Sequence, residues 1–370
     1  MINLNVSKNS NIDNIFNKIY QSRHLDNDDL FCLLEDSENF NEIIQTADCI
    51  NKSINSNKVS YVVNRNINFT NICYLNCKFC GYKRTANSKD SFTLTIDKII
   101  EKINEGYKIG INEICVTGGI NPDFNPDFYF DLIKYIRANF PELHIHAFSP
   151  QEIFELSCKT GFSYEKVFEI LKENGLNSMP GTAAEILAPE TRKTICKDKI
   201  SADKWVKIIK TAHKMDIKSS ATILFGHIES NTDIVYHLDL IRKIQDETNG
   251  FTEFIALPFI SHKTSLKHQV KIDINTNANR QKILKFYAIL RLYLHNFKNI
   301  QTSWPKIGAE LAVQSLACGT NDFGGTLMEE SITKSAGGNF GEYLSESDII
   351  SLIKSAGKIP VRRDTLYNYI

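Results

Sequence analysis

The chain lacks an excess of charge of either sign, because its 370 residues carry 43 Lys and Arg against 43 Asp and Glu. This balance gives no overall field that favours nucleic acid or an anionic membrane surface, so we expect small-molecule partners. No apolar run reaches the roughly 18 residues that a membrane span needs. The residues from Met1 to Val6 also lack the basic region and apolar stretch of a secretory signal, which predicts a cytoplasmic location.

A disulfide framework is missing as well, since nine cysteines are an odd number without framework spacing. A reducing compartment fits this usage. Six of the nine are scattered and are interpreted as ordinary structural residues: Cys32, Cys49, Cys115, Cys158, Cys196 and Cys318. The chain also lacks internal repeats and low-complexity linkers.

The other three cysteines, Cys73, Cys77 and Cys80, fall within eight residues in a Cys-x-x-x-Cys-x-x-Cys pattern. Three thiolates can hold three irons of a 4Fe-4S cube, which leaves the fourth iron open to a ligand that is not protein. Cysteines at this spacing would also share one face of a buried helix, but the residues between them are partly polar. A zinc knuckle would need a fourth ligand at short spacing, whereas Cys49 and Cys115 lie more than twenty residues away.

From about Val59, short β-rich runs alternate with amphipathic helical runs, which is typical of a parallel sheet. The eight predicted strands, the number that closes a barrel, are 59–69, 113–117, 144–148, 178–180, 219–225, 252–258, 300–304 and a short one near 321. We therefore expect an α/β fold, a (βα)8 TIM-barrel-like domain over residues 58–345. A helical extension over residues 1–57 should cover one end like a lid, and a helix with a basic strap should follow over residues 346–370.

In such a barrel, function lies on the loops after each strand, at the C-terminal mouth. The cysteine loop follows the first predicted strand, and Gly118 and Gly119 follow the second. Glycine lets the backbone approach a ligand closely because it has no Cβ. A plain turn is the alternative interpretation of this pair.

Charged residues at the later loops are candidate site residues. Glu185 can accept hydrogen bonds from a cofactor or substrate, or it can be a solvated glutamate at a helix start. His227 and Glu229 are candidate acid/base or substrate groups, with a surface pair as the alternative. Arg192 can bind a carboxylate through its planar fork or pair with a neighbouring acid. Asp322 lies in a run suited to a polyhydroxylated ligand, which a tight turn explains nearly as well.

The cysteine segment resembles the signature loop of the radical SAM enzymes, down to the aromatic Phe79 before the last cysteine. The resemblance implies S-adenosylmethionine (SAM) on the open iron and a 5'-deoxyadenosyl radical formed by one electron from the cluster. It also implies that Phe79, Gly118, Gly119 and Glu185 contact the cofactor. The third residue of the family's glycine motif is usually acidic but is Ile120 here, so the glycine pair must act through its main chain.

From Val59 to the C-terminus the chain is similar to the 4-hydroxybenzyl-transferring subunit family of FO synthase, which helps to make coenzyme F-420. The residues that carry the resemblance are 64–71, 178–187, 196–200 and 321–331. Related enzymes of the futalosine route to menaquinone resemble Pro-Gly-Gly-Gly-Ala-Glu at the fourth strand. This chain has Thr182 and Ala183 within Pro-Gly-Thr-Ala-Ala-Glu instead, which favours the FO synthase family.

This resemblance implies a reaction between L-tyrosine and 5-amino-6-(D-ribitylamino)uracil. The tyrosine Cα–Cβ bond breaks, its 4-hydroxybenzyl group adds to carbon 5 of the uracil, and the rest of tyrosine leaves as 2-iminoacetate. Glu185 and His227 are the expected catalytic residues, and Thr182, Arg192, Glu229 and Asp322 the expected substrate-binding residues.

Since the chain has one cysteine motif, a separate ring-closing FO synthase subunit and a low-potential electron donor are the expected partners. The alternatives are a menaquinone-route aminofutalosine synthase or dehypoxanthine futalosine cyclase and, from another class, a non-catalytic iron-sulfur electron carrier or structural zinc protein. The carrier predicts a fourth ligand and no dependence on SAM.

Overall fold

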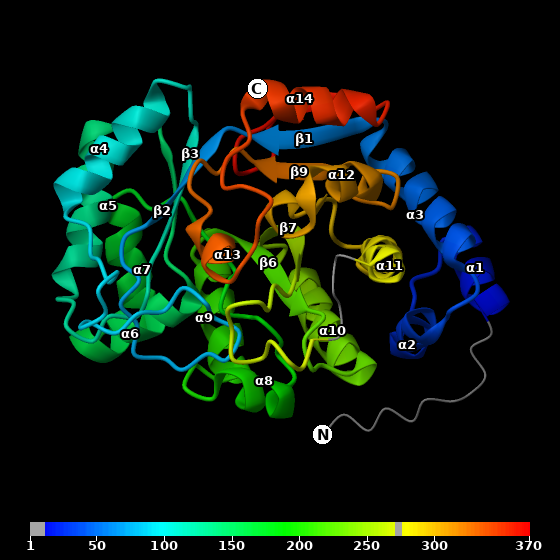
Figure 1. The fold of residues 1–370 in the computed structure, drawn as a ribbon, viewed down its shortest axis with the longest axis horizontal. Helices are drawn as coiled ribbons and strands as arrows, with labels where there is room; N and C mark the ends of the chain where they lie inside the picture. Colours follow the sequence, from blue (N-terminus) through cyan, green and yellow to red (C-terminus); the bar gives the residue numbers. More distant parts are fainter. Residues whose placement is uncertain (1–11, 271–275) are drawn as a thin grey trace.

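The computed structural model of the protein describes residues 12–270 and 276–370, and its centre is one parallel sheet of ten strands (Figure 1). The order across the sheet is β10-β1-β9-β8-β7-β6-β5-β4-β3-β2. The strands are β1 Lys58–Val62, β2 Asn64–Asn68, β3 Glu113–Thr117, β4 His144–Ala147, β5 Ser178–Met179, β6 Lys218–Phe225, β7 Phe251–Pro258, β8 Ile300–Gln301, β9 Asp322–Gly325 and β10 Ile359–Arg362. The α/β barrel expected from the alternating sequence pattern is confirmed.

The first predicted strand is in fact two strands, and this division closes the barrel. The chain bends at Val63, so that β1 pairs with β9 and β10 whereas β2 pairs with β3. Beyond β9, the amide of Asn66 on β2 donates a hydrogen bond to the carbonyl of Leu327 at 2.8 Å. The two ends of the sheet therefore meet around one bent strand. The C-terminal strap contains β10, which pairs in parallel with β1 and was not predicted as a strand.

Helices follow most of the strands, and most of these helices cover the outside of the sheet, whereas α13 lies over its mouth (Figure 1). They are α4 Ile96–Tyr107, α5 Asp127–Asn139, α6 Pro150–Thr160, α7 Tyr164–Glu173, α8 Pro189–Cys196, α9 Ala202–Lys214, α10 Asn231–Thr248, α11 Asn277–Tyr293, α12 Trp304–Ser315, α13 Ser331–Ser335 and α14 Glu346–Ser355. In α9, the side chain of Ser201 caps the N-terminus and Trp205, Ile208 and Ile209 form the buried face. None of the helices in the described ranges is long and apolar enough to span a membrane.

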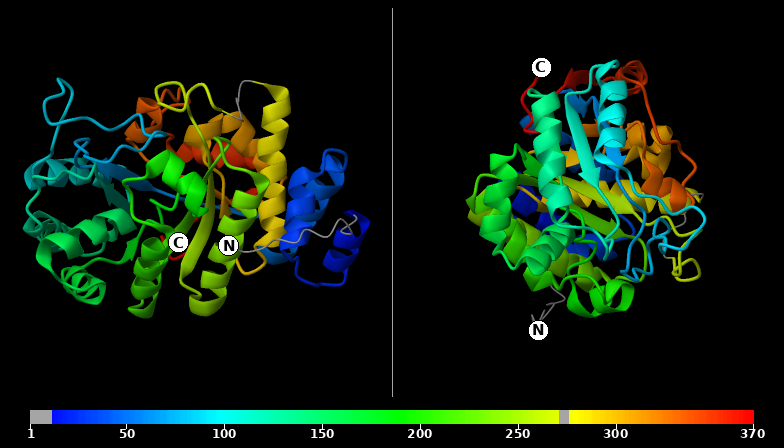
Figure 2. Two further views of the ribbon diagram at one scale, coloured as in Figure 1. Left: turned by 90° about the horizontal axis from the view of Figure 1, so that it is seen from below. Right: turned by 90° about the vertical axis from the view of Figure 1, so that its left-hand side faces the viewer.

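Three N-terminal helices, α1 Ile12–Tyr20, α2 Asn27–Glu35 and α3 Phe40–Asn55, precede the barrel. They pack beside α10 and α11 on the flank of the barrel (Figure 2). For example, Arg242 on α10 donates to the carbonyl of Leu25 at 2.7 Å, and Tyr293 on α11 donates to Asn27 at 2.6 Å. The expected lid over one end is therefore wrong, because the apolar faces of these helices are buried against other helices.

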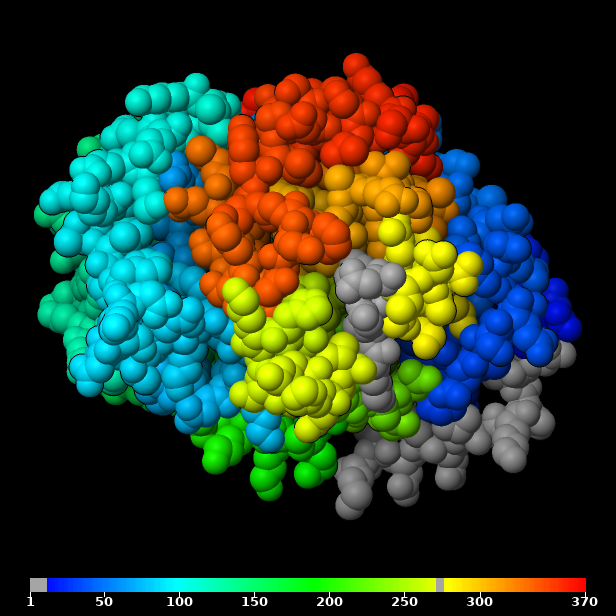
Figure 3. Space-filling view, viewed as in Figure 1, coloured from blue at the N-terminus to red at the C-terminus, as the bar shows by residue number. Residues whose placement is uncertain are grey.

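Three loop segments gather over the C-terminal mouth instead (Figure 3). The cysteine loop meets the segment after β7 where Ser265 donates its amide to the carbonyl of Lys78 at 3.0 Å. That segment meets the α13 region where Lys263 donates to the carbonyl of Ala336, also at 3.0 Å. A Cβ on Gly81 would lie 2.7 Å from Ala336, so the cysteine loop and the α13 region are in close contact. These segments enclose the space above the sheet.

Candidate active site

A cavity of about 420 Å³ occupies the barrel interior and reaches from the cysteine loop down to the first residues of several strands. Alternate residues of a strand face it, as expected from the pleat. They include Asn64, Asn66 and Asn68 on β2, Glu113, Cys115 and Thr117 on β3, and Glu253, Ile255 and Leu257 on β7. The cavity is thus a shaft with largely apolar walls that carry several polar side chains, and its upper end lies at the cysteine loop.

Cys73, Cys77 and Cys80 all line the upper part of this cavity as free, half-buried thiols. Neighbouring backbone fixes their loop: Cys73 donates its amide to the carbonyl of Arg84 at 3.0 Å, and Cys80 donates to that of Cys77 at 3.1 Å. In residues 12–270 and 276–370, no three or more His, Cys, Asp or Glu side chains converge on one metal ion. Each of these three thiols could bind a different iron of a 4Fe-4S cluster.

The cysteine loop packs directly on the glycine pair that follows β3. A Cβ added to Gly119 would lie 2.3 Å from the carbonyl oxygen of Ile72, and one added to Gly118 would lie 2.6 Å from the ring of Phe69. The amide of Gly119 also donates to the carbonyl of Thr70 at 2.8 Å. Both positions therefore require glycine for close approach of the two loops, and both line the cavity.

Glu152 is a cavity-lining carboxylate that the sequence interpretation missed. Ser149 and Glu152 form a capping box at the start of α6, and Glu152 Oε1 also accepts from the amide of Gly118 at 3.1 Å. Burial raises the pKa of Glu152 to about 7, despite the hydrogen bonds from Ser149 and Gly118. The Ser-x-x-Glu spacing of a capping box was the available signal. Glu152 positions the glycine loop beside the cysteines.

Glu185 lies on the cavity wall and forms an ion pair with Lys199, with Lys199 Nζ 2.6 Å from Glu185 Oε1. The side chains are only 15% and 13% exposed. Burial alone would raise the pKa of Glu185, but the adjacent Lys199 ammonium outweighs it and holds this pKa below its ordinary value. Lys199 Nζ also lies 5.4 Å from the ring centroid of Phe79, a second cavity-lining residue. Lys199 lies in the 196–200 segment that carries the resemblance, but no role was predicted for it from the sequence.

Arg192 does not line the cavity and is not placed to bind a substrate carboxylate. Its buried guanidinium donates to the carbonyls of Ala183, Ala184 and Ile186 at 2.9, 2.6 and 3.3 Å, and twice to that of Ile200. Every guanidinium N–H is therefore used to hold the loop that presents Glu185. Thr182, on the same loop as Glu185, does line the cavity. The carbonyl of Thr182 accepts a hydrogen bond from Trp205 Nε1 at 3.1 Å.

His227 and Glu229 are buried in the turn after β6 and are not among the cavity-lining residues. The Glu229 carboxylate accepts from the amides of Gly226 and His227 at 2.5 and 2.9 Å. The ring of His227 contacts the carbonyl of Leu224 through Nε2 at 3.1 Å and accepts from the amide of Ile228 at 2.7 Å. His227 and Glu229 therefore stabilise this turn. From the sequence, they were expected to be either acid/base or substrate groups or a surface pair.

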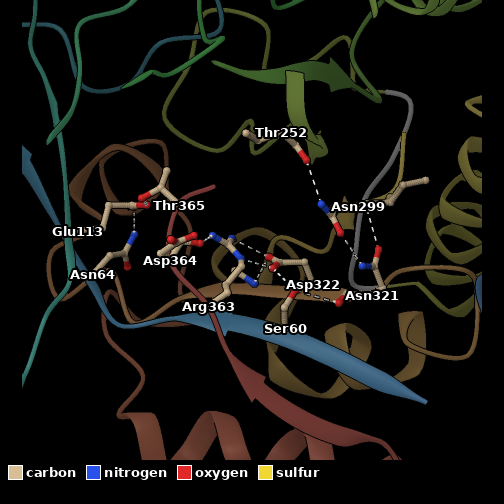
Figure 4. Close-up of polar contacts among 12 residues, drawn as sticks. Ser60, Asn64, Glu113, Thr252, Asn299, Asn321, Asp322, Arg363, Asp364 and Thr365 are labelled. Carbon is tan, nitrogen blue, oxygen red and sulfur yellow. Dashed lines mark hydrogen bonds and ion pairs between the residues drawn. The ribbon is translucent and has the colours of Figure 1, made fainter. Parts of the chain in front are cut away.

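From the sequence, Asp322 was expected at the mouth of the barrel. Asp322 is instead the first residue of β9 and so lies at the opposite end. It is fully buried in an ion pair with Arg363, whose Nε and Nη2 lie 2.6 and 3.1 Å from its carboxylate oxygens (Figure 4). Ser60 Oγ also donates to Asp322, at 2.6 Å. Its partner Arg363 lines the bottom of the cavity.

Two family models match the chain: the radical SAM superfamily over residues 67–241 and the CofH/MqnC C-terminal region over residues 248–370. Among solved structures, methylornithine synthase (PylB) is similar with a TM-score of 0.69 and 19% identity, covering 94% of this chain and 97% of its own. The [FeFe]-hydrogenase maturase HydG has a TM-score of 0.74 and 16% identity, covering 96% and 76% respectively. These two likenesses support the barrel fold.

Curated relatives cover almost the whole chain. A 5-amino-6-(D-ribitylamino)uracil–L-tyrosine 4-hydroxyphenyl transferase of Methanococcus maripaludis strain C5 is 43% identical over 355 residues, which are 95% of this chain and 98% of that protein. The one from Methanocaldococcus jannaschii is 42% identical over 342 residues, 91% of this chain and 95% of that protein. The chain therefore belongs to the family of 5-amino-6-(D-ribitylamino)uracil–L-tyrosine 4-hydroxyphenyl transferases in the radical SAM superfamily.

Proposed function

We propose that this enzyme cleaves L-tyrosine between Cα and Cβ and transfers its 4-hydroxybenzyl group to 5-amino-6-(D-ribitylamino)uracil, a step in the synthesis of FO and coenzyme F-420. One observation carries the proposal. A loop with three cysteines opens onto a largely apolar cavity that several polar side chains also line, in a chain that matches transferases of this name along nearly their full length. A non-catalytic electron carrier needs no such cavity.

The residues present fit the cofactors of the superfamily. Cys73, Cys77 and Cys80 would hold three irons of a 4Fe-4S cluster, and Gly118 and Gly119 line the cavity beside them, where the amino acid end of SAM would bind. When bound, these cofactors supply the 5'-deoxyadenosyl radical that takes one hydrogen atom from tyrosine.

The protein's own contribution is to position the substrates and exclude water and oxygen. The Glu185–Lys199 pair offers a carboxylate and an ammonium side by side, which is complementary to the zwitterionic end of an amino acid. Thr182 extends the same wall of the cavity. We assign the binding of tyrosine or of the methionyl part of SAM to this wall. Arg192 has a positioning role instead, because it holds the loop that presents Glu185, and His227 and Glu229 stabilise the turn after β6.

The remaining partners belong to the same proposal. The chain carries one cluster motif, so a separate ring-closing subunit is expected to take up the product, and a low-potential donor is expected to reduce the cluster. All nine cysteines are free thiols, which supports a reducing, cytoplasmic location.

The test is anaerobic reconstitution with iron and sulfide, followed by quantification of 5'-deoxyadenosine in the presence of SAM and each candidate substrate. The proposal expects that formation of 5'-deoxyadenosine depends on tyrosine and that its amount rises when the ribitylaminouracil is added. Comparable turnover of futalosine-type substrates would move the enzyme to the menaquinone route. Tight zinc binding with no cluster absorbance would refute radical chemistry.

A further inference from the structure

The lower end of the cavity is rich in hydrogen-bond acceptors and lies well below the cysteines. Glu253, Ile255 and Leu257 line the cavity from successive inward positions on β7. A strand rises about 3.3 Å per residue, so Glu253 lies about 13 Å below Leu257 at the mouth end of the strand. The carboxylate of Glu113 and the guanidinium of Arg363 line the same lower region.

Most of the charged groups at this floor have protein partners. Glu113 accepts from Asn64 at 2.9 Å and from Thr365 at 2.5 Å, and Arg363 is paired with Asp322 (Figure 4). The residue that differs is Glu253. It is only 7% exposed, and its Oε2 accepts no hydrogen bond from any residue in the described part of the chain.

A buried carboxylate oxygen without a donor is costly, so its retention beside a cavity points to a donor supplied by a ligand. We infer that Glu253 binds the ribityl chain of the ribitylaminouracil by accepting a hydrogen bond from one of its hydroxyl groups. This inference rests on the proposed function and adds the orientation of the second substrate: its polyol chain points down the barrel and its ring points toward the cysteines.

The chemistry of the floor favours the ribityl chain over tyrosine. Two carboxylates, those of Glu113 and Glu253, line the floor, and the nearby guanidinium of Arg363 is already paired with Asp322, so the floor repels an amino acid carboxylate and attracts O–H donors. Asn66 faces the cavity one inward position above Asn64. Its side-chain amide carries the donor and acceptor that match the imide edge of a uracil ring.

Burial raises the pKa of Glu253 to about 7, although the nearby guanidinium of Arg363 and a hydrogen bond from the Thr252 side chain to the carboxylate oppose the shift, and the carboxylates of Asp322 and Glu113 add to it. A ligand that donates a hydroxyl proton prefers the ionised acceptor. The affinity of the wild-type enzyme for the ribitylaminouracil should therefore rise as the pH increases through about 7. This pH dependence of the affinity can be measured on the wild-type enzyme alone.

The test compares two ligands by calorimetry on the reconstituted holoenzyme: 5-amino-6-(D-ribitylamino)uracil, and 5,6-diaminouracil, which has the same ring without the ribityl chain. Glu253→Gln should weaken binding of the first about 10-fold and of the second less than about twofold, and should remove the pH dependence. Glu310→Gln, at an exposed carboxylate on α12, is the matched control and should change neither affinity.

Equal losses for both ligands, or unchanged affinity for the ribityl compound, would overturn the inference while the wild-type enzyme still forms the adduct. A wild-type affinity that does not rise between pH 6 and pH 8 would overturn it as well, even if Glu253→Gln does not fold. If the wild-type enzyme makes no adduct from tyrosine and the ribitylaminouracil, the proposed function fails and this inference fails with it.

Discussion

Replacing Lys199 by methionine keeps most of the side-chain volume but removes the cation that neutralises Glu185. The two charges are 2.6 Å apart, and at an effective dielectric constant of about 20 their gross attraction is about 6 kcal/mol. Breaking a buried pair by removing one partner costs about 3 to 5 kcal/mol. Both side chains retain some exposure to the cavity, 13% and 15%, so we expect Lys199→Met to lower the free energy of unfolding by about 2 to 3 kcal/mol.

A double-mutant cycle isolates this pair from the loss of packing. Glu185→Gln alone also leaves one charge unpaired, whereas the double variant leaves none, so it should be more stable than the sum of the single effects by about 1 to 2 kcal/mol. Urea unfolding of the four proteins measures the coupling. Lys98→Met removes a lysine from an exposed pair on α4 and should leave stability unchanged. Single effects that add to within about 0.5 kcal/mol would show that Lys199 and Glu185 do not stabilise one another.

Three further predictions concern the cluster loop, its support and the pH dependence of stability. Cys77→Ala should abolish 5'-deoxyadenosine formation because no neighbour replaces the lost iron ligand, whereas Cys318→Ala should retain it; activity in Cys77→Ala would contradict the assignment. Gly119→Ala places a Cβ 2.3 Å from a backbone oxygen, so the iron content per chain should fall, and full iron loading would refute the close fit. Burial lowers the pKa of His237 in the folded protein to about 3. As the pH falls below about 6.5, His237 therefore binds a proton in the unfolded chain before it does so in the folded protein, and the free energy of unfolding declines by up to about 1.4 kcal/mol per pH unit. His237→Gln should flatten this decline in urea unfolding at pH 7, 6 and 5, and an unchanged slope would exclude His237 as its source.

The sequence predicted the barrel well because parallel strands and their covering helices carry strong periodic patterns. The one strand expected over 59–69 shows where that reasoning ends: β-rich composition continues through Val63, but the change of pairing partners there depends on segments more than 250 residues later. The helix α6 was missed, although Ser149 and Glu152 carry a capping-box spacing.

The site was predictable only where a local spacing carries the chemistry. The cysteine motif is such a spacing, and the structure places all three thiols on one cavity. Arg192 and His227 were expected to contact ligands, but their polar atoms are used by nearby backbone groups, which composition cannot reveal. The pairing of Asp322 with Arg363 joins two residues 41 positions apart, so the sequence could not show that Asp322 faces the floor of the barrel.

The central claim is the transfer of a hydroxybenzyl group to the ribitylaminouracil, and isotope tracing by mass spectrometry measures it directly. The reconstituted wild-type enzyme would be incubated anaerobically with SAM, a reductant, the ribitylaminouracil and tyrosine labelled with ¹³C in its ring and Cβ. The account predicts an adduct that contains the intact ribitylaminouracil and every labelled carbon, with one 5'-deoxyadenosine formed per adduct. Tyrosine cleavage that releases the label without any uracil adduct would contradict it.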